Sequence, residues 1–96
     1  MKILSLNLHC FQEENRIEKL NKIADFIKEN DIDVCLFQEV CQETDKVILE
    51  GKIKVGNSAN HIRNKLGYEI YYHPVKIGFD IYDEGLAIIK RIKEME

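Results

Sequence analysis

The sequence predicts an α/β fold in which a sheet carries its helices on one face. Three neighbouring segments support this class: an alternating stretch at residues 2–8, a stretch with helical spacing at residues 15–30, and an apolar run at residues 33–40. A strand, an amphipathic helix and a strand within about 40 residues form the layout of a βαβ unit. The two strands of such a unit are parallel and joined by a right-handed crossover.

The first half of the chain is expected to hold the first strand and the first helix. Alternation places three leucines on one side of residues 2–8: Leu4, Leu6 and Leu8. The apolar stripe of residues 15–30 recurs at helical spacing: Ile17, Leu20, Ile23, Ala24 and Ile27. Asn15 followed by Glu18 resembles a capping box, and Asn30 is the expected end of the helix.

The second half is expected to hold another helix and two more strands. The helix is predicted from Ser58, as its cap, to Leu66, with Gly67 ending it. The other predicted segments are a loop at 41–57 with a short hairpin around Glu50–Gly51, a strand at 68–73, a loop at 74–84 and a strand at 85–90.

The composition indicates one small cytoplasmic domain. The chain has 96 residues and a net charge of −3, which argues against a strong electrostatic hold on nucleic acid or an anionic membrane. Such a charge does not exclude a phosphate substrate held by a metal. No apolar run approaches the roughly 20 residues that span a bilayer, and the N-terminal segment lacks signal-peptide features. Cys10, Cys35 and Cys41 are odd in number without a C-x-x-C pair, so no disulfide framework is expected.

Polar side chains are placed near the ends of the two predicted parallel strands. Asn7 and Glu39 each lie near the end of their own strand, and parallel strands share a carboxyl end, where ligands bind in open α/β sheets. A carboxylate with an amide oxygen suits a hard cation such as Mg²⁺. The simpler alternatives are a solvated Glu39 and, for Asp83-Glu84-Gly85, an ordinary turn. A zinc site is a further alternative, although its spacings match no standard pattern; its ligands would be His9, Cys10, Cys35 and Cys41.

Three segments, "LSLNLH", "DVCLFQEV" and "GFDIYDEGLAII", occur in this order. Together they resemble the N-terminal part of bacterial members of the endonuclease/exonuclease/phosphatase superfamily, the deoxyribonuclease I-like phosphohydrolases. The resemblance implies a four-layer sandwich of two packed sheets flanked by helices. Residues 1–96 would then form a single incomplete domain, about the N-terminal third of the whole.

The resemblance also implies roles for individual residues. Asn7 and Glu39 would lie at the catalytic metal, which would be Mg²⁺ with Mn²⁺ as an alternative. Tyr82 would lie near the scissile phosphate, and Glu84 would orient a catalytic histidine. In the family an Asp and a His position and activate the water that attacks a metal-bound phosphoester.

Two later motifs of the family, Gly-Asp-x-Asn and Ser-Asp-His, do not occur in the sequence. We therefore expect a truncated metal-dependent phosphoester hydrolase that is inactive on its own, and whether the chain is an enzyme stays open. The sheet face opposite the helices is expected to be bare, which favours self-association through that face. The alternative function is a non-catalytic α/β remnant that self-associates or binds a protein partner.

Overall fold

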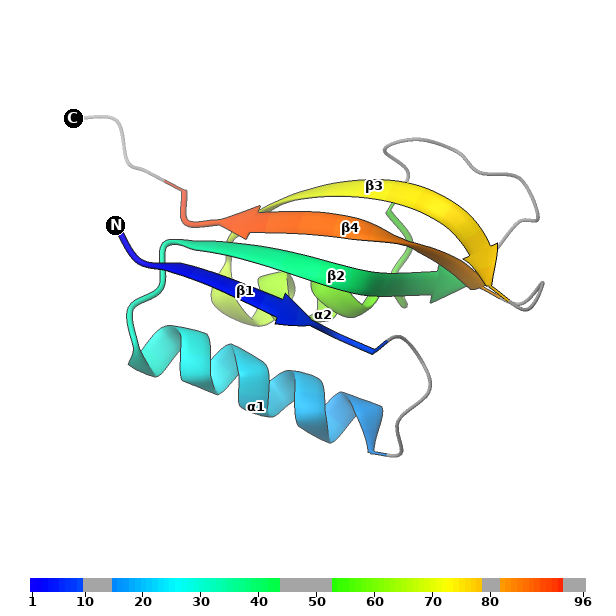
Figure 1. The fold of residues 1–96 in the computed structure, drawn as a ribbon. Helices are drawn as coiled ribbons and strands as arrows, with labels where there is room; N and C mark the ends of the chain where they lie inside the picture. Colours follow the sequence, from blue (N-terminus) through cyan, green and yellow to red (C-terminus); the bar gives the residue numbers. More distant parts are fainter. Residues whose placement is uncertain (10–14, 44–52, 79–81, 93–96) are drawn as a thin grey trace.

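The computed structural model describes residues 1–9, 15–43, 53–78 and 82–92, and these form a mixed α/β unit (Figure 1). Its elements along the chain are β1 (Ile3–Asn7), α1 (Arg16–Glu29), β2 (Val34–Glu43), α2 (Ser58–Leu66), β3 (Glu69–Gly78) and β4 (Tyr82–Lys90). The strands form one sheet in the order β1-β2-β4-β3. The pair β1–β2 is parallel, and both pairs that involve β4 are antiparallel.

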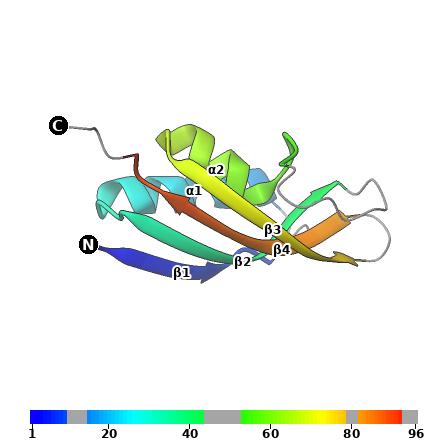
Figure 2. The same cartoon turned by 90° about the horizontal axis from the view of Figure 1, so that it is seen from above.

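Both helices lie on the same face of the sheet, as predicted (Figure 2). The core lies between that face and the helices and consists of side chains from both: Leu20, Ala24 and Ile27 of α1, Ala59 and Ile62 of α2, and Cys35, Phe37, Ala87 and Ile89 of the inner strands. Complete burial of one such aliphatic side chain contributes about 1.5–3 kcal/mol, so this face provides most of the stabilisation. None of the helices in the described ranges is long and apolar enough to cross a membrane.

The opposite face of the sheet is not covered by any described residue. Successive residues of a strand point to opposite faces, so residues that alternate with the buried Phe37 and Ala87 face away from the helices. Their large apolar members come from all four strands: Ile3 of β1, Leu36 of β2, Leu86 and Ile88 of β4, and Tyr71 of β3. We call this surface the open face. It agrees with the expectation of a bare face from the sequence.

The helix boundaries agree with the prediction, but the caps differ. Asn15 has a left-handed backbone (φ 56°) and no side-chain cap bond, so the predicted capping box is wrong. The cap of α2 is Asn57, whose side-chain oxygen accepts from the backbone N–H of Asn60 at 3.1 Å. Ser58 instead uses its hydroxyl to accept the N–H of Cys41 at 3.2 Å, which joins α2 to β2. Gly67 ends α2 with φ 70°, as predicted.

Strands β2, β3 and β4 extend beyond their predicted ends. β2 continues to Glu43, β3 continues through Pro74, and β4 begins at Tyr82, so the predicted loop at 74–84 is wrong for all of its described residues. Proline fits here because β3 is an edge strand, where a missing N–H removes no ladder bond. The predicted apolar stripe of α1 is also wrong in the first turn, where Ile17 is 47% exposed. The predicted hairpin at Glu50–Gly51 lies outside the described residues.

Candidate metal centre at the carboxyl end of the parallel strands

The parallel pair brings the carboxyl ends of β1 and β2 together. Asn7 is the register partner of Gln38, and the N–H of Leu8 continues the ladder by donating to the carbonyl of Gln38 at 2.9 Å. The predicted meeting of Asn7 with Glu39 is therefore observed. The register brings Gln38, and with it the next residue Glu39, beside Asn7, and a bulge at Glu39 turns its side chain toward Asn7.

A β-bulge interrupts β2 at this point. Phe37 pairs with Ala87 and Val40 pairs with Gly85, so two residues of β2 lie opposite Leu86 alone. Glu39 is the second residue of the bulge and has a φ of 49°. A glutamate in the left-handed region is uncommon, and such strain and bulges concentrate next to functional sites, where they re-aim a side chain. The bulge therefore identifies Glu39 as a residue held in place for its side chain.

Asn7 holds the Glu39 carboxylate from the neighbouring strand. The Nδ2 of Asn7 donates to the Oε2 of Glu39, and the Oδ1 of Asn7 accepts from the backbone N–H of His9 at 2.7 Å. His9 has a φ of 58°, so the backbone after β1 bends to make this bond. Since its oxygen is used by His9, Asn7 is arranged to orient the carboxylate.

Gln38 extends the polar group along the open face. Its Nε2 donates to the hydroxyl of Ser5 and to the carbonyl of Leu36, both at 3.1 Å. Neither Gln38 nor the backbone of His9 was among the predicted site residues. Gln38 could have been found from its position, because it precedes Glu39 in the sequence and the parallel register places it opposite Asn7.

The other two predicted site residues lie on β4, at the same end of the sheet. Glu84 is the register partner of Cys41, the second residue after Glu39, and its Oε2 is 3.4 Å from the Nζ of Lys76. Tyr82 opens β4, and its backbone pairs with Glu43. The structure describes only the backbone of Tyr82, so its predicted role at the phosphate stays a prediction, as does the role of Glu84.

This end of the sheet has an acidic character. Asp83 is 4% exposed, and its Oδ1 has no hydrogen-bond partner within the described part of the chain. The pKa of the buried Tyr72 phenol is raised first by burial and then by the negative charges of Asp83 and Glu84. A neighbourhood of carboxylates disfavours further negative charge and attracts cations.

The donor types at this end fit an oxygen-binding cation as part of a site. Mg²⁺ commonly takes one or two protein carboxylates and completes its shell with water and substrate phosphate. Glu39 supplies one such carboxylate. Within the described ranges, no group of three or more His, Cys, Asp or Glu side chains could hold a metal. Further ligands therefore have to come from outside these residues.

The cysteines do not support the zinc alternative. Cys35 lies in the core, where burial raises the pKa of its thiol to about 12, so the thiolate that zinc requires is disfavoured. Cys41 is part of a disulfide, whereas the sequence predicts no disulfide framework. Cys10 lies outside the described residues.

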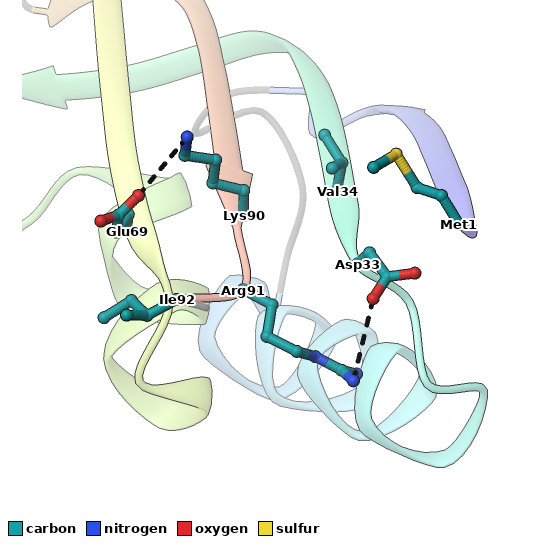
Figure 3. Close-up of a pocket in the computed structure, with 7 residues that line it drawn as sticks. All are labelled: Met1, Asp33, Val34, Glu69, Lys90, Arg91 and Ile92. Carbon is teal, nitrogen blue, oxygen red and sulfur yellow. Dashed lines mark ion pairs between the residues drawn. The ribbon is translucent and has the colours of Figure 1, made fainter. Parts of the chain in front are cut away.

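A cavity of about 640 Å³ lies at the opposite end of the sheet (Figure 3). Its lining comes from strand ends and the segment after β4: Met1, Asp33, Val34, Glu69, Lys90, Arg91 and Ile92. The charges there are paired, with Lys90 Nζ 3.6 Å from Glu69 Oε2 and Arg91 Nη1 3.8 Å from Asp33 Oδ1. None of the predicted site residues lines this cavity.

The fold and sequence were compared with known proteins. The structure of an endonuclease/exonuclease/phosphatase family protein from Leptotrichia buccalis C-1013-b matches with a TM-score of 0.85 and 36% sequence identity, over 97% of this chain. The predicted relationship to the endonuclease/exonuclease/phosphatase family is confirmed. The α/β unit accordingly has the deoxyribonuclease I-like fold over its length. No family model matches the chain, and no curated protein matches it.

The chain spans 38% of the length of this family protein. The larger part of the neighbour therefore has no counterpart in these 96 residues. The activity of a whole family domain is consequently a proposal for this chain, and it depends on groups that the described residues do not contain.

Proposed function

We propose that the chain is part of a metal-dependent phosphoester hydrolase in which Glu39 binds the metal. The observation that carries this proposal is the placement of Glu39 on a bulge, in a left-handed conformation, with Asn7 bonded to its carboxylate. Strain of this kind costs of order 1–3 kcal/mol and persists where the surroundings enforce it. The acidic neighbourhood and the family relationship support the same function.

The proposed roles belong to residues of three strands, β1, β2 and β4. Glu39 would bind Mg²⁺ or Mn²⁺ through one carboxylate oxygen while Asn7 orients the other. When bound, the metal acts as a Lewis acid and a template for the phosphoester. On β4, Glu84 would hold the ring of a histidine supplied from outside the chain, and Tyr82 would contact the phosphate. The net charge of −3 favours a small phosphoester over a long nucleic acid.

The test is metal binding by the 96-residue chain. A Mn²⁺ titration followed by electron paramagnetic resonance should show binding that weakens at least about tenfold in Glu39→Gln, which corresponds to about 1.4 kcal/mol. Glu43→Gln is the matched control, because Glu43 is an exposed glutamate on the same strand. Equal Mn²⁺ binding by wild type and Glu39→Gln would contradict the proposal.

The chain alone is expected to hydrolyse phosphoesters negligibly with either metal. Among the described residues, no histidine side chain bonds to the Glu39 carboxylate, and the sequence lacks the later family motifs. A chromogenic phosphodiester and a phosphomonoester serve as substrates. Robust turnover that disappears in Glu39→Gln would show that the chain is a complete enzyme. A cytoplasmic location stays a prediction.

A second candidate function is a non-catalytic module that self-associates or binds a protein through the open face. The exposed apolar side chains on all four strands favour it. Sedimentation at several concentrations distinguishes the two. Oligomerisation without Glu39-dependent metal binding supports the module, and metal binding by a monomer supports the hydrolase fragment.

A further inference from the structure

Cys41 connects the candidate metal centre to the redox chemistry of thiols. It lies two residues after Glu39 on β2, it is 0% exposed, and it is part of a disulfide. Its Sγ lies 3.8 Å from the carbonyl oxygen of Glu39, and its backbone N–H donates to the hydroxyl of Ser58. The bonded sulfur is therefore packed directly against the backbone of the bulge.

Counting and spacing identify the second cysteine of this disulfide. The chain has three cysteines, and Cys35 is a free thiol in the core, so only Cys10 is left. Cys10 lies outside the described residues, but the strand register gives an independent indication. Its separation in sequence from Cys41 equals that between all register partners in β1 and β2, such as Asn7 and Gln38. Neighbouring strands are about 4.8 Å apart, which is within the Cα spacing that a disulfide needs.

A bond between these two cysteines would hold the segments that form the candidate metal centre. Residue 10 directly follows His9, whose N–H donates to the Oδ1 of Asn7 at 2.7 Å. The Nδ2 of Asn7 in turn donates to the Glu39 carboxylate. Both His9 and Glu39 have positive φ, at 58° and 49°, and such conformations persist where the surroundings enforce them. A crosslink just beyond His9 and Glu39 would provide this enforcement.

We propose that a disulfide between Cys10 and Cys41 acts as a redox clasp that controls metal binding by Glu39. The oxidised chain holds the Glu39 carboxylate and its Asn7 partner in register. The reduced chain releases the segment after β1, and the carboxylate loses its fixed orientation. The control of metal binding rests on the proposed function, whereas the clasp itself rests on the cysteines.

The switch is a two-electron exchange with a dithiol reductant. A thiolate of the dithiol attacks one sulfur of the protein disulfide, the S–S bond breaks, and a mixed disulfide forms. The second thiol of the reductant then displaces the protein sulfur. Two electrons and two protons pass to the protein, which ends with two thiols, and the reductant ends as a disulfide. In a reducing compartment, such as the predicted cytoplasm, disulfides are commonly catalytic or redox-sensing.

The test compares the oxidised and reduced forms of the 96-residue chain. Mass spectrometry of tryptic peptides, prepared without reductant, should show Cys10 joined to Cys41 within one chain. After reduction with dithiothreitol and desalting under argon, Mn²⁺ binding followed by electron paramagnetic resonance should weaken at least about tenfold. Hydrogen exchange at the amides of Leu8 and His9 should accelerate in the same reduced sample.

Two single substitutions separate the clasp from other effects of reduction. Cys10→Ser removes one sulfur of the clasp, and it should bind Mn²⁺ as weakly as the reduced chain, with or without dithiothreitol. Cys35→Ala is the matched control, because Cys35 is a free thiol, and it should keep the full redox dependence. Circular dichroism checks that both variants fold, and the comparison of oxidised with reduced wild type needs neither variant.

The outcomes separate this inference from the proposed function. Cys10 and Cys41 found unjoined, or joined between two copies of the chain, would overturn the clasp. If reduction accelerates exchange at Leu8 and His9 but neither form binds Mn²⁺ through Glu39, the clasp stands and the proposed function falls. If both forms bind Mn²⁺ equally through Glu39, the proposed function stands and the redox control falls.

Discussion

Both ends of the sheet carry charged side chains, but the partners of these side chains differ. At the end that includes the cavity of Figure 3, Arg91 Nη2 lies 2.6 Å from Asp31 Oδ1, and Lys90 lies beside Glu69. At the carboxyl end of β1 and β2, Glu39 has an amide as its partner, and no described cation pairs with it. Paired charges hold the cavity end together, whereas Glu39 at the carboxyl end has no counter-charge among the described residues.

The backbone shows the same contrast. Asp31 and Glu39 both have positive φ, at 55° and 49°. Asp31 lies in the turn after α1, where aspartate commonly adopts this conformation. Glu39 lies inside a strand, where a glutamate rarely does. The same dihedral angle is therefore ordinary turn chemistry at one end and an indicator of a functional position at the other.

The largest expected effect comes from Gly85, which lies between the bulges of β2 and β3. A Cβ here would meet the carbonyl oxygen of His73 and lie 2.7 Å from the Cα of Pro74, both backbone atoms. Gly85→Ala should therefore lower the free energy of unfolding by about 3 kcal/mol. In Gly56→Ala, where no atom lies within 4 Å, the change should stay within about 1 kcal/mol. Urea unfolding measures both, and equal effects would mean that β3 can move aside.

Substitutions at Glu39 test its backbone strain and its metal binding separately, through stability and Mn²⁺ binding. Glu39→Gly should keep or raise stability, because relief of about 1–2 kcal/mol of strain offsets a lost hydrogen bond worth about 1 kcal/mol. Glu39→Val should be less stable than Glu39→Gly by about 2 kcal/mol, and both should lose Mn²⁺ binding. If the two variants unfold at the same urea concentration, the backbone at residue 39 is not strained.

His61, which lies away from both ends of the sheet, makes the free energy of unfolding depend on pH. Its Nε2 is 2.7 Å from the Oδ1 of Asn21, which joins α2 to α1. Burial, followed by Lys65 and Arg16, lowers the pKa of His61, so the unfolded chain binds this proton more readily than the folded one. The contribution of His61 to the free energy of unfolding is present above about pH 6.5. It is lost as the pH falls through the pKa of His61 in the folded state, which is the lower of the two. His61→Gln should flatten the dependence of unfolding on pH in this range.

The smallest expected effect is at the cavity end. Arg91→Gln removes the ion pairs with Asp31 and Asp33, which are exposed and screened by salt. The melting temperature should fall slightly at low salt, and Mn²⁺ binding should not change. A loss of Mn²⁺ binding comparable to that of Glu39→Gln would invalidate the distinction between the two ends.

The βαβ unit and the placement of Asn7 and Glu39 near one edge of the sheet follow from local patterns. Alternation, helical spacing and parallel pairing depend on residues close in sequence, and they place these two side chains at one edge of the sheet. The resemblance of three short segments to the family was sufficient to predict the fold that the solved neighbour shows.

The features that the sequence did not reveal depend on distant partners. The bulge at Glu39 exists because β2 pairs with β4, some 45 residues later in the chain. β3 passes through Pro74 because it lies at an edge, which only the strand order decides. The cap at Asn57 rather than Ser58 depends on Ser58 being engaged by Cys41. Neither a propensity nor a motif contains this information.

The strand order also bears on how the polypeptide is made. β4 is the last strand along the described chain, yet it lies inside the sheet, between β2 and β3. Among the described strands, β3 pairs with β4 alone. While the nascent chain emerges from the ribosome, β2 therefore keeps one unpaired edge, and β3 has no place in the sheet until residues 82–90 follow. Unpaired strand edges invite aggregation, so this interval is when the growing chain most needs a chaperone.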